Sequence, residues 1–194
     1  MMRKISLHIT LISASVLLMA IPAHAQFTQT EMQKLLASDR ASNDELGWSV
    51  AIDGDTAVIG ASREDDSGTR LNGAAYVFTR SSGIWTQQAK LLASDKSDVD
   101  QFGWSVAIHG DTVVIGAYGE DDTGTEGNGA AYVFTRDADA WTQQAKLLAS
   151  DKSSGDLFGF SVALEGNTAV IGAAFKNDSG SADVGAVYVF ERSG

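Results

Sequence analysis

The sequence contains no cysteine, one proline and three histidines in 194 residues. Without cysteine, the chain gains no disulfide from an oxidising compartment and has no thiol for lipid attachment. Basic residues are also scarce, since 14 Lys and Arg face 25 Asp and Glu and leave a formal charge of −11. A surface with this charge repels nucleic acid and anionic membranes, and it favours solubility or cation binding. We therefore expect no nucleic-acid partner.

The first 25 residues have the layout of a secretory signal peptide. They open with two basic residues, Arg3 and Lys4, continue with a mostly apolar stretch at 5–21, and end on the small-x-small sequence Ala-His-Ala. The apolar stretch is short for a membrane span, so we expect a leader that is cut before Gln26 rather than an anchor. The mature chain is then secreted, periplasmic or on the cell surface, without a membrane segment.

The rest of the chain repeats with a period of 56 residues. Equivalent positions include Gly47, Gly103 and Gly159, and the segment WTQQAKLLASDK occurs identically from Trp85 and from Trp141. A fixed period of this size indicates a repeated supersecondary unit, in a solenoid or a propeller. The repeats cover residues 46–101, 102–157 and 158–194.

Each repeat contains four strand-like runs, which in the middle copy are residues 102–108, 111–118, 129–136 and 140–150. The first run alternates with a period of two, and the second is apolar at consecutive positions, as in a strand covered on both faces. Four antiparallel strands per repeat describe a propeller blade better than a solenoid coil. The predicted fold is all-β, with three four-stranded antiparallel blades of a partial β-propeller over residues 26–194. Residues 27–38 are predicted as a further outer strand.

Two residues that end in glycine join the first two strands of each repeat, at 53–54, 109–110 and 165–166. Such a pair favours a tight hairpin, whereas a calcium loop usually takes about a dozen residues. We therefore interpret the sequence DGD at 53–55 as a turn and not as a metal site. His109, the only histidine beyond the leader, is interpreted as a solvated turn residue rather than as a catalytic base.

Phe102-Gly103 with Gly116-Ala117, and Phe158-Gly159 with Gly172-Ala173, resemble the FG-GAP repeat of integrin α-subunit propellers and of many secreted bacterial proteins. The downstream segments GAAYVF and GAVYVF fit the same pattern. This chain departs from the pattern where Leu46 replaces phenylalanine, and it lacks the calcium loop that integrin-type repeats carry between the first two strands. The resemblance implies a propeller with a binding or adhesion role, and it carries over no metal ligands.

Three blades are too few for a closed ring, because propellers typically have four to eight. An open arrangement leaves an apolar blade face bare at each end, at a cost comparable to the stability of a domain. Two alternatives stay open. Either the chain self-associates as a homo-oligomer that closes the propeller, or it is a structural repeat fragment of a larger propeller.

The long connections of the repeats concentrate acidic side chains at one end of the predicted blades, where loops on a rigid scaffold commonly bind ligands. The connections are residues 39–45, 63–72, 95–101, 119–128, 151–157 and 174–184. The candidate ligand-binding residues are Glu64, Asp65, Asp66, Glu120, Asp121, Asp122 and Glu126. A weak calcium site at Asp65, Asp66, Asp121 and Asp122 is one interpretation. Solvated Asx-type turns without metal are the other, and no cofactor is predicted.

Trp48, Trp104 and Phe160 occupy alternating strand positions and are predicted as core between blades rather than as a sugar-stacking platform. The predicted function is that of an exported, non-catalytic binding or adhesion module whose acidic loop face meets a protein or glycan ligand. A structural repeat fragment without a ligand of its own is the main alternative. An enzyme that cleaves polysaccharides with paired carboxylates is a third.

Overall fold

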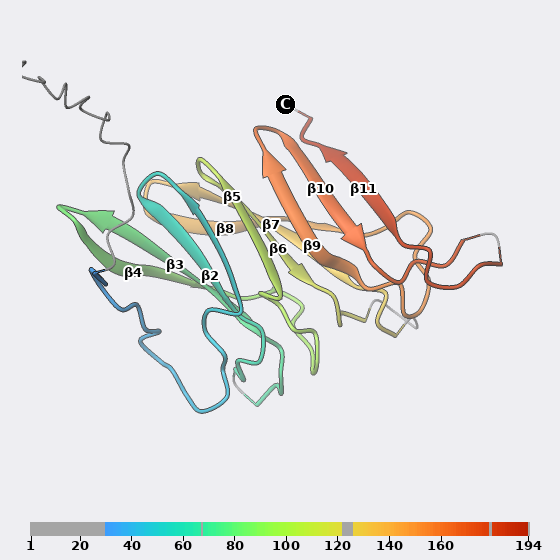
Figure 1. The fold of residues 1–194 in the computed structure, drawn as a ribbon, viewed down its shortest axis with the longest axis horizontal. Coiled ribbons are helices and arrows are strands. Elements are labelled where there is room, and N and C mark those ends of the chain that lie inside the picture. The colour runs from blue at the N-terminus through green and yellow to red at the C-terminus, as the bar shows by residue number, and fades with distance from the viewer. Residues whose placement is uncertain (1–29, 67, 122–125, 179, 194) are drawn as a thin grey trace, which may run out of the picture. The chain divides into compact units, whose positions relative to one another are not determined.

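The structure, a computed structural model, describes residues 30–66, 68–121, 126–178 and 180–193 (Figure 1). The chain divides into two compact units, residues 1–32 and 33–194. The predicted leader at 1–25 lies outside the described residues and stays a prediction. Within the described ranges, no helix has the length and apolarity needed to cross a membrane. The described strands all belong to the second unit.

The second unit consists of three antiparallel sheets, one for each repeat. The first sheet pairs its strands in chain order: β1 (Ser49–Asp53), β2 (Thr56–Ala61), β3 (Ala74–Ser81) and β4 (Ile84–Leu91). The second sheet does the same: β5 (Ser105–His109), β6 (Thr112–Ala117), β7 (Ala130–Asp137) and β8 (Ala140–Leu147). The third sheet has three strands: β9 (Phe158–Glu165), β10 (Thr168–Ala173) and β11 (Ala186–Glu191). The prediction of an all-β chain with one antiparallel blade per repeat is confirmed.

Two details of the predicted strands differ from the structure. The third blade has three described strands instead of four, because the position equivalent to the start of β8 falls beyond residue 194. Residues 30–38, expected within an outer strand, carry no strand because their backbone lacks a ladder partner among the described residues. The side chain of Gln33 instead brackets Trp85, donating to its carbonyl at 2.8 Å and accepting from its amide at 2.9 Å.

The first two blades are superimposable in register. Val77 faces Ala89 and Val133 faces Ala145, and a bulge follows directly in each blade, between Val77 and Phe78 and at the same place one repeat later. The hairpin turns are confirmed with a shift of one residue. Asp53 pairs with Thr56, so the two loop residues are 54–55 and not 53–54. His109 likewise ends β5 and pairs with Thr112.

The blades pack face to face through two apolar clusters. We term the face of a blade toward the preceding repeat its leading face, and the opposite face its trailing face. One cluster joins Val58 and Val77 on the trailing face of the first blade to Val113 on the leading face of the second. Val114, the next residue of β6, belongs to the cluster shared with Phe158 of the third blade. The middle blade is therefore covered on both faces, as its consecutive apolar run predicts.

The phenylalanine–glycine pair at 102–103 inserts its backbone into the preceding blade. Phe102 N donates to Asn72 O at 2.9 Å, and Ser49 Oγ donates to Gly103 O at 2.8 Å. The same contacts recur one repeat later, where Ser105 Oγ donates to the carbonyl of Gly159 at 2.8 Å. Gly103 has a φ of 87°, and a Cβ on it would lie 2.3 Å from Ala74 O. Only glycine fits this position, so the sequence motif is a packing contact between blades.

We predict that Gly103→Ala destabilises the protein far more than Gly110→Ala. Both glycines have a positive φ, of 87° and 57°, but a Cβ on Gly110 meets no atom within 4 Å. Gly110→Ala therefore costs about 1 kcal/mol of backbone strain alone. Gly103→Ala adds a clash with a buried backbone and costs more than about 3 kcal/mol. Chemical denaturation of both variants measures the difference, and equal losses would show that the close approach does not exist.

Candidate functional site

A cluster of charged side chains ties each of the first two blades to the segment before it. In the first, Lys90 Nζ donates to Asp39 Oδ2 at 2.8 Å and to Glu64 Oε1 at 2.6 Å. Tyr76 Oη donates to the other oxygen of Asp39 at 2.9 Å. One repeat later the same roles fall to equivalent residues: Lys146, Asp95, Glu120 and Tyr132. We term these the first and second junction clusters.

Burial and pairing act in opposite directions on the groups of these clusters. Burial works to raise the pKa of Asp39, but the hydrogen bonds from Lys90 and Tyr76 outweigh it and hold that pKa below its usual value. For Glu64, burial prevails and raises the pKa, although Lys90 opposes it. Burial also works to lower the pKa of Lys90, but its two carboxylate partners raise it instead. The lysine therefore stays charged, and its ammonium holds both acids.

The third repeat builds its junction from a different residue. Lys176 stands where Glu64 and Glu120 stand in the other two repeats. Its Nζ donates to Asp151 O at 2.6 Å and to Asp156 Oδ2 at 3.0 Å, and it lies 3.4 Å from Asp151 Oδ2. A lysine at the glutamate position thus supplies the cation that the fourth strand supplies in the other blades. The sequence analysis missed this residue, although alignment of the three repeats exposes the change from acid to base.

Asp100 is a buried carboxyl beside the second junction cluster. Its side chain is only 1 % exposed, and Oδ2 accepts from Ser97 N at 2.5 Å. Its other oxygen has no hydrogen-bond partner among the described residues. Burial raises the pKa of Asp100 to about 7, and the nearby charge of Glu120 raises it further, against the bond from Ser97. In the third repeat, the equivalent Asp156 has Lys176 as its partner.

Three of the predicted ligand-binding residues serve the junctions instead of facing solvent. Glu64 and Glu120 are buried, at 6 % and 4 % exposure, and each bonds a lysine. Asp66 is half-buried and pairs with Lys96. These carboxylates hold the blades together, so the acidic loop face is smaller than the sequence suggested.

The other predicted ligand residues are exposed, apart from one that is not described. Asp65 Oδ1 accepts from Leu71 N at 2.6 Å, and Asp121 Oδ1 accepts from Gly127 N, which closes each loop as an Asx-type turn does. Glu126 is exposed. Asp122 lies outside the described residues. Across the part of the chain that the structure describes, no group of three or more His, Cys, Asp or Glu side chains gathers as metal ligands.

Five aromatic side chains form a continuous row across the three blades. The ring centroids of Trp48 and Trp104 lie 4.5 Å apart, and those of Trp104 and Tyr118 also 4.5 Å. Tyr118 and Phe160 lie 5.7 Å apart, and Phe160 and Phe175 lie 6.3 Å apart. The ends of the row are open, since Trp48 is 47 % and Phe175 is 44 % exposed. The prediction that Trp48 is core between blades is wrong, because no described blade covers the leading face of β1.

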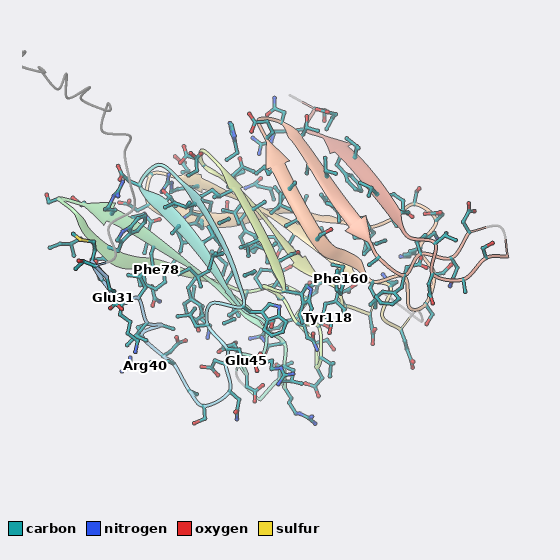
Figure 2. All side chains as sticks on the ribbon, in the orientation of Figure 1. Glu31, Arg40, Glu45, Phe78, Tyr118 and Phe160 are labelled. Carbon is teal, nitrogen blue, oxygen red and sulfur yellow. The ribbon has the colours of Figure 1, made fainter. Side chains whose placement is uncertain are left out.

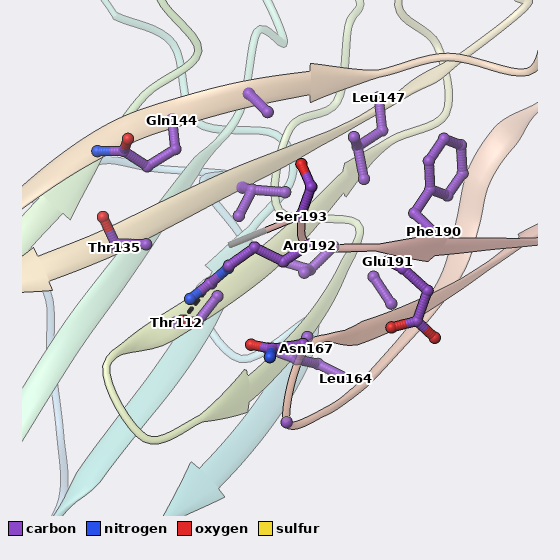
Figure 3. A pocket seen from close by; sticks show the side chains of 15 residues that line it. Thr112, Thr135, Gln144, Leu147, Leu164, Asn167, Phe190, Glu191, Arg192 and Ser193 are labelled. Carbon is purple, nitrogen blue, oxygen red and sulfur yellow. Dashed lines mark hydrogen bonds between the residues drawn. The ribbon is translucent and has the colours of Figure 1, made fainter.

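A cavity of about 500 Å³ opens between the second and third blades (Figure 3). Its walls include Val133, Gln144, Leu147, Leu164, Phe190 and Arg192. The equivalent space one blade earlier is filled by Trp141, whose Nε1 donates to Gln88 Oε1 at 2.9 Å. Arg136, the equivalent of Arg192, lies 5.2 Å from the centre of that indole. The cavity thus has the walls of an indole site.

Three segments of the chain match the sequence profile of one family. They are residues 29–78, 85–134 and 141–190, and the family is described as FG-GAP repeat. Each match runs from an outer-strand segment to the third strand of the blade that follows it. No curated protein matches the chain.

We predict that Asp100→Asn stabilises the protein at pH 8 and flattens the fall of its stability between pH 4 and pH 7. The pKa of about 7 in the folded state lies above the ordinary value of 3.8, so folding takes up a proton in this window. The stability from that protonation is therefore full below about pH 4 and is lost as the pH rises through 7, by roughly 1–3 kcal/mol. Asparagine keeps an acceptor for Ser97 N and carries no charge.

The matched control is Asp156→Asn, the same position one repeat later. Asp156 is fully buried and pairs with Lys176, so this variant loses an ion pair and is destabilised by about 2–4 kcal/mol at neutral pH. Thermal unfolding of both variants from pH 4 to pH 8 measures the two effects. A destabilised Asp100→Asn at pH 8 would contradict the burial argument.

Proposed function

The chain belongs to the FG-GAP repeat family, and on that premise we propose that it is an exported, non-catalytic binding or adhesion module. The family is a β-propeller-like repeat module that is typically structural or binding. The loop end of the blades meets a protein or glycan ligand in this proposal. The predicted leader at residues 1–25 places the protein outside the cytoplasm.

The aromatic row is the observation that carries the proposal. Tyr118 directly precedes the loop at 119–128, and Phe175 lies within the loop at 174–184, so the row adjoins the loop end (Figure 2). Its rings pack on one another, yet the terminal Trp48 and Phe175 leave nearly half of their surface open. Exposed, rigid aromatic rings supply contact area at a low entropic cost, which is why they dominate binding hot spots.

The chemistry beside the row favours a ligand with basic side chains. Asp65, Asp121 and Glu126 are exposed on the long loops, and the chain carries a formal charge of −11. Carboxylates pair with lysine or arginine, aromatic faces attract the same cations, and a negative surface steers a cationic partner toward it. A protein segment that carries lysine or arginine therefore fits better than a neutral glycan.

The alternatives have less support in the structure. His109 lies at a hairpin tip with Nδ1 3.5 Å from Glu165 Oε2, in the role of the turn residue that the sequence predicted. The buried carboxylates Glu64 and Glu120 are held by lysines, which is a structural role rather than that of a paired acid and base. A purely structural fragment would have no need of an exposed aromatic row.

The test is a binding titration with an array of lysine- and arginine-rich peptides and an array of neutral oligosaccharides. We predict binding to basic peptides that weakens at least tenfold in Trp48→Ala and in the double variant Asp65→Asn/Asp121→Asn. The asparagines keep acceptors for Leu71 N and Gly127 N, so the loops stay closed while their charge is lost. Higher salt weakens the binding of the parent protein for the same electrostatic reason.

Asp137→Asn at the opposite, hairpin end of the second blade is the matched control and leaves the affinity unchanged. Thermal unfolding confirms that each variant is folded. Oligosaccharide binding that depends on Trp48 would assign the row to a glycan instead. Binding of neither array, or binding unaffected by all of these variants, would reject the loop end as the recognition surface.

A further inference from the structure

The leading face of the first blade and the trailing face of the third blade carry bare apolar side chains. On β1, Val50 is 69 % and Ile52 is 64 % exposed. Their equivalents on β5, Val106 and Ile108, are buried against the trailing face of the first blade. On β11, Val187 is 66 % and Val189 is 63 % exposed.

The equivalents of these valines are covered in the two interior interfaces. Ala75 and Val77 on β3 are fully buried against the second blade, and Ala131 on β7 is fully buried against the third. The bare trailing face of the third blade is thus the same kind of surface as the two that a following blade covers. The bare leading face of the first blade is the same kind of surface as those that cover them.

A second cavity marks where a phenylalanine–glycine pair would enter the third blade. It measures about 510 Å³, and Ser161, Gly172, Val184 and Val187 are among its lining residues. In the interior interfaces the equivalent serines, Ser49 and Ser105, donate to the carbonyls of Gly103 and Gly159. The segment of this chain that has the same place in the repeat is Leu46-Gly47.

The outer edge of β11 also lacks a partner among the described strands. In the first two blades that edge pairs with β4 and β8, whose last residues belong to the repeated sequence KLLAS. The same five residues occur a third time at 34–38, in the segment that forms no strand. Leu35 and Ala37 of this segment already pack on the first blade, as Leu91 and Ala93 pack on the second.

We propose that a second copy of this chain docks head to tail on the third blade. Residues 33–38 of the second copy add the missing fourth strand to the edge of β11, and Leu46-Gly47 of that copy enters the cavity at Ser161. The first blade of the second copy then buries Val50 and Ile52 against Val187 and Val189. The interface repeats the one that the chain already forms twice within itself.

The register of the added strand follows from the first two blades. A shift of 56 residues from the pairs of β7 and β8 places Leu35 opposite Val187, Lys34 opposite Tyr188 and Gln33 opposite Val189. Lys34 takes the place of Lys90 and Lys146, and its target is Asp151, as theirs are Asp39 and Asp95. The charges match, since Lys34 is exposed and Asp151 lies among further acids, Asp156 and Asp178.

Two copies close the arrangement. A head-to-tail interface generates a ring if its rotation closes, and two copies of three blades give six, within the range of four to eight blades of known propellers. The ring has two identical interfaces and leaves no blade face bare. It differs from a face-to-face dimer, in which the same residue of each copy meets its counterpart.

The test uses cysteine pairs in the full chain, expressed with its own leader and purified as the host processes it. The natural chain has no cysteine, so the background is empty. We predict that Gln33→Cys/Val189→Cys oxidises to a covalent species of two chains, because directly opposed strand residues are within disulfide range. A mixture of the two single variants also forms a covalent pair, and neither single variant does so alone. Crosslinking within either single variant would show a face-to-face dimer and overturn the proposal.

Sedimentation of the uncrosslinked protein gives the second measurement. The parent chain is expected as one species at twice the mass of a single chain, and Val189→Lys as one species at the mass of a single chain. Val99→Lys, which alters an equally apolar, exposed residue away from both bare faces, stays at twice the mass. A parent chain that sediments as a monomer at micromolar concentration, or as an open series of aggregates, would overturn the proposal.

Discussion

The structure depends on a backbone contact between blades that is too close for any side chain. The carbonyl of Gly103 lies against Gly60 and accepts from Ser49 Oγ at 2.8 Å, and Gly159 repeats the arrangement against Gly116. Because a Cβ at Gly60 would lie 1.9 Å from that carbonyl oxygen, both sides of the contact must be glycine. This distance fixes how far apart neighbouring sheets lie, and the apolar clusters on their faces are packed at that spacing.

Electrostatics reinforces the same junctions at their outer side. A lysine held between two acids and a tyrosine joins each of the first two blades to the segment before it, and the third blade reaches the same end with Lys176. Breaking such a pair leaves a buried charge without its partner, which costs much more than the pair contributes over apolar packing. The acids of the chain therefore divide into buried groups that hold blades together and exposed groups, such as Asp65 and Asp121, that remain for a ligand.

The period of 56 residues was sufficient to predict the blades, because strand alternation, hairpin glycines and apolar runs recur in register in all three copies. The roles of single acids could not be predicted in the same way. Glu64 and Asp65 are neighbours in the sequence, yet one is buried on Lys90 and the other closes a loop in solvent. That difference depends on a lysine 26 residues away. Trp48 was misplaced for a similar reason, since its burial depends on a blade that precedes it and not on its own strand.

The most direct measurement of the central claim is hydrogen–deuterium exchange at the amides of Phe102 and Phe158. Both amides donate across a blade junction, to the carbonyls of Asn72 and Asn128, at 2.9 Å. If the blades are joined by these backbone contacts, both amides exchange as slowly as the central amides of β6, because they open only when the blades separate. Exchange at the rate of an exposed loop would contradict the account.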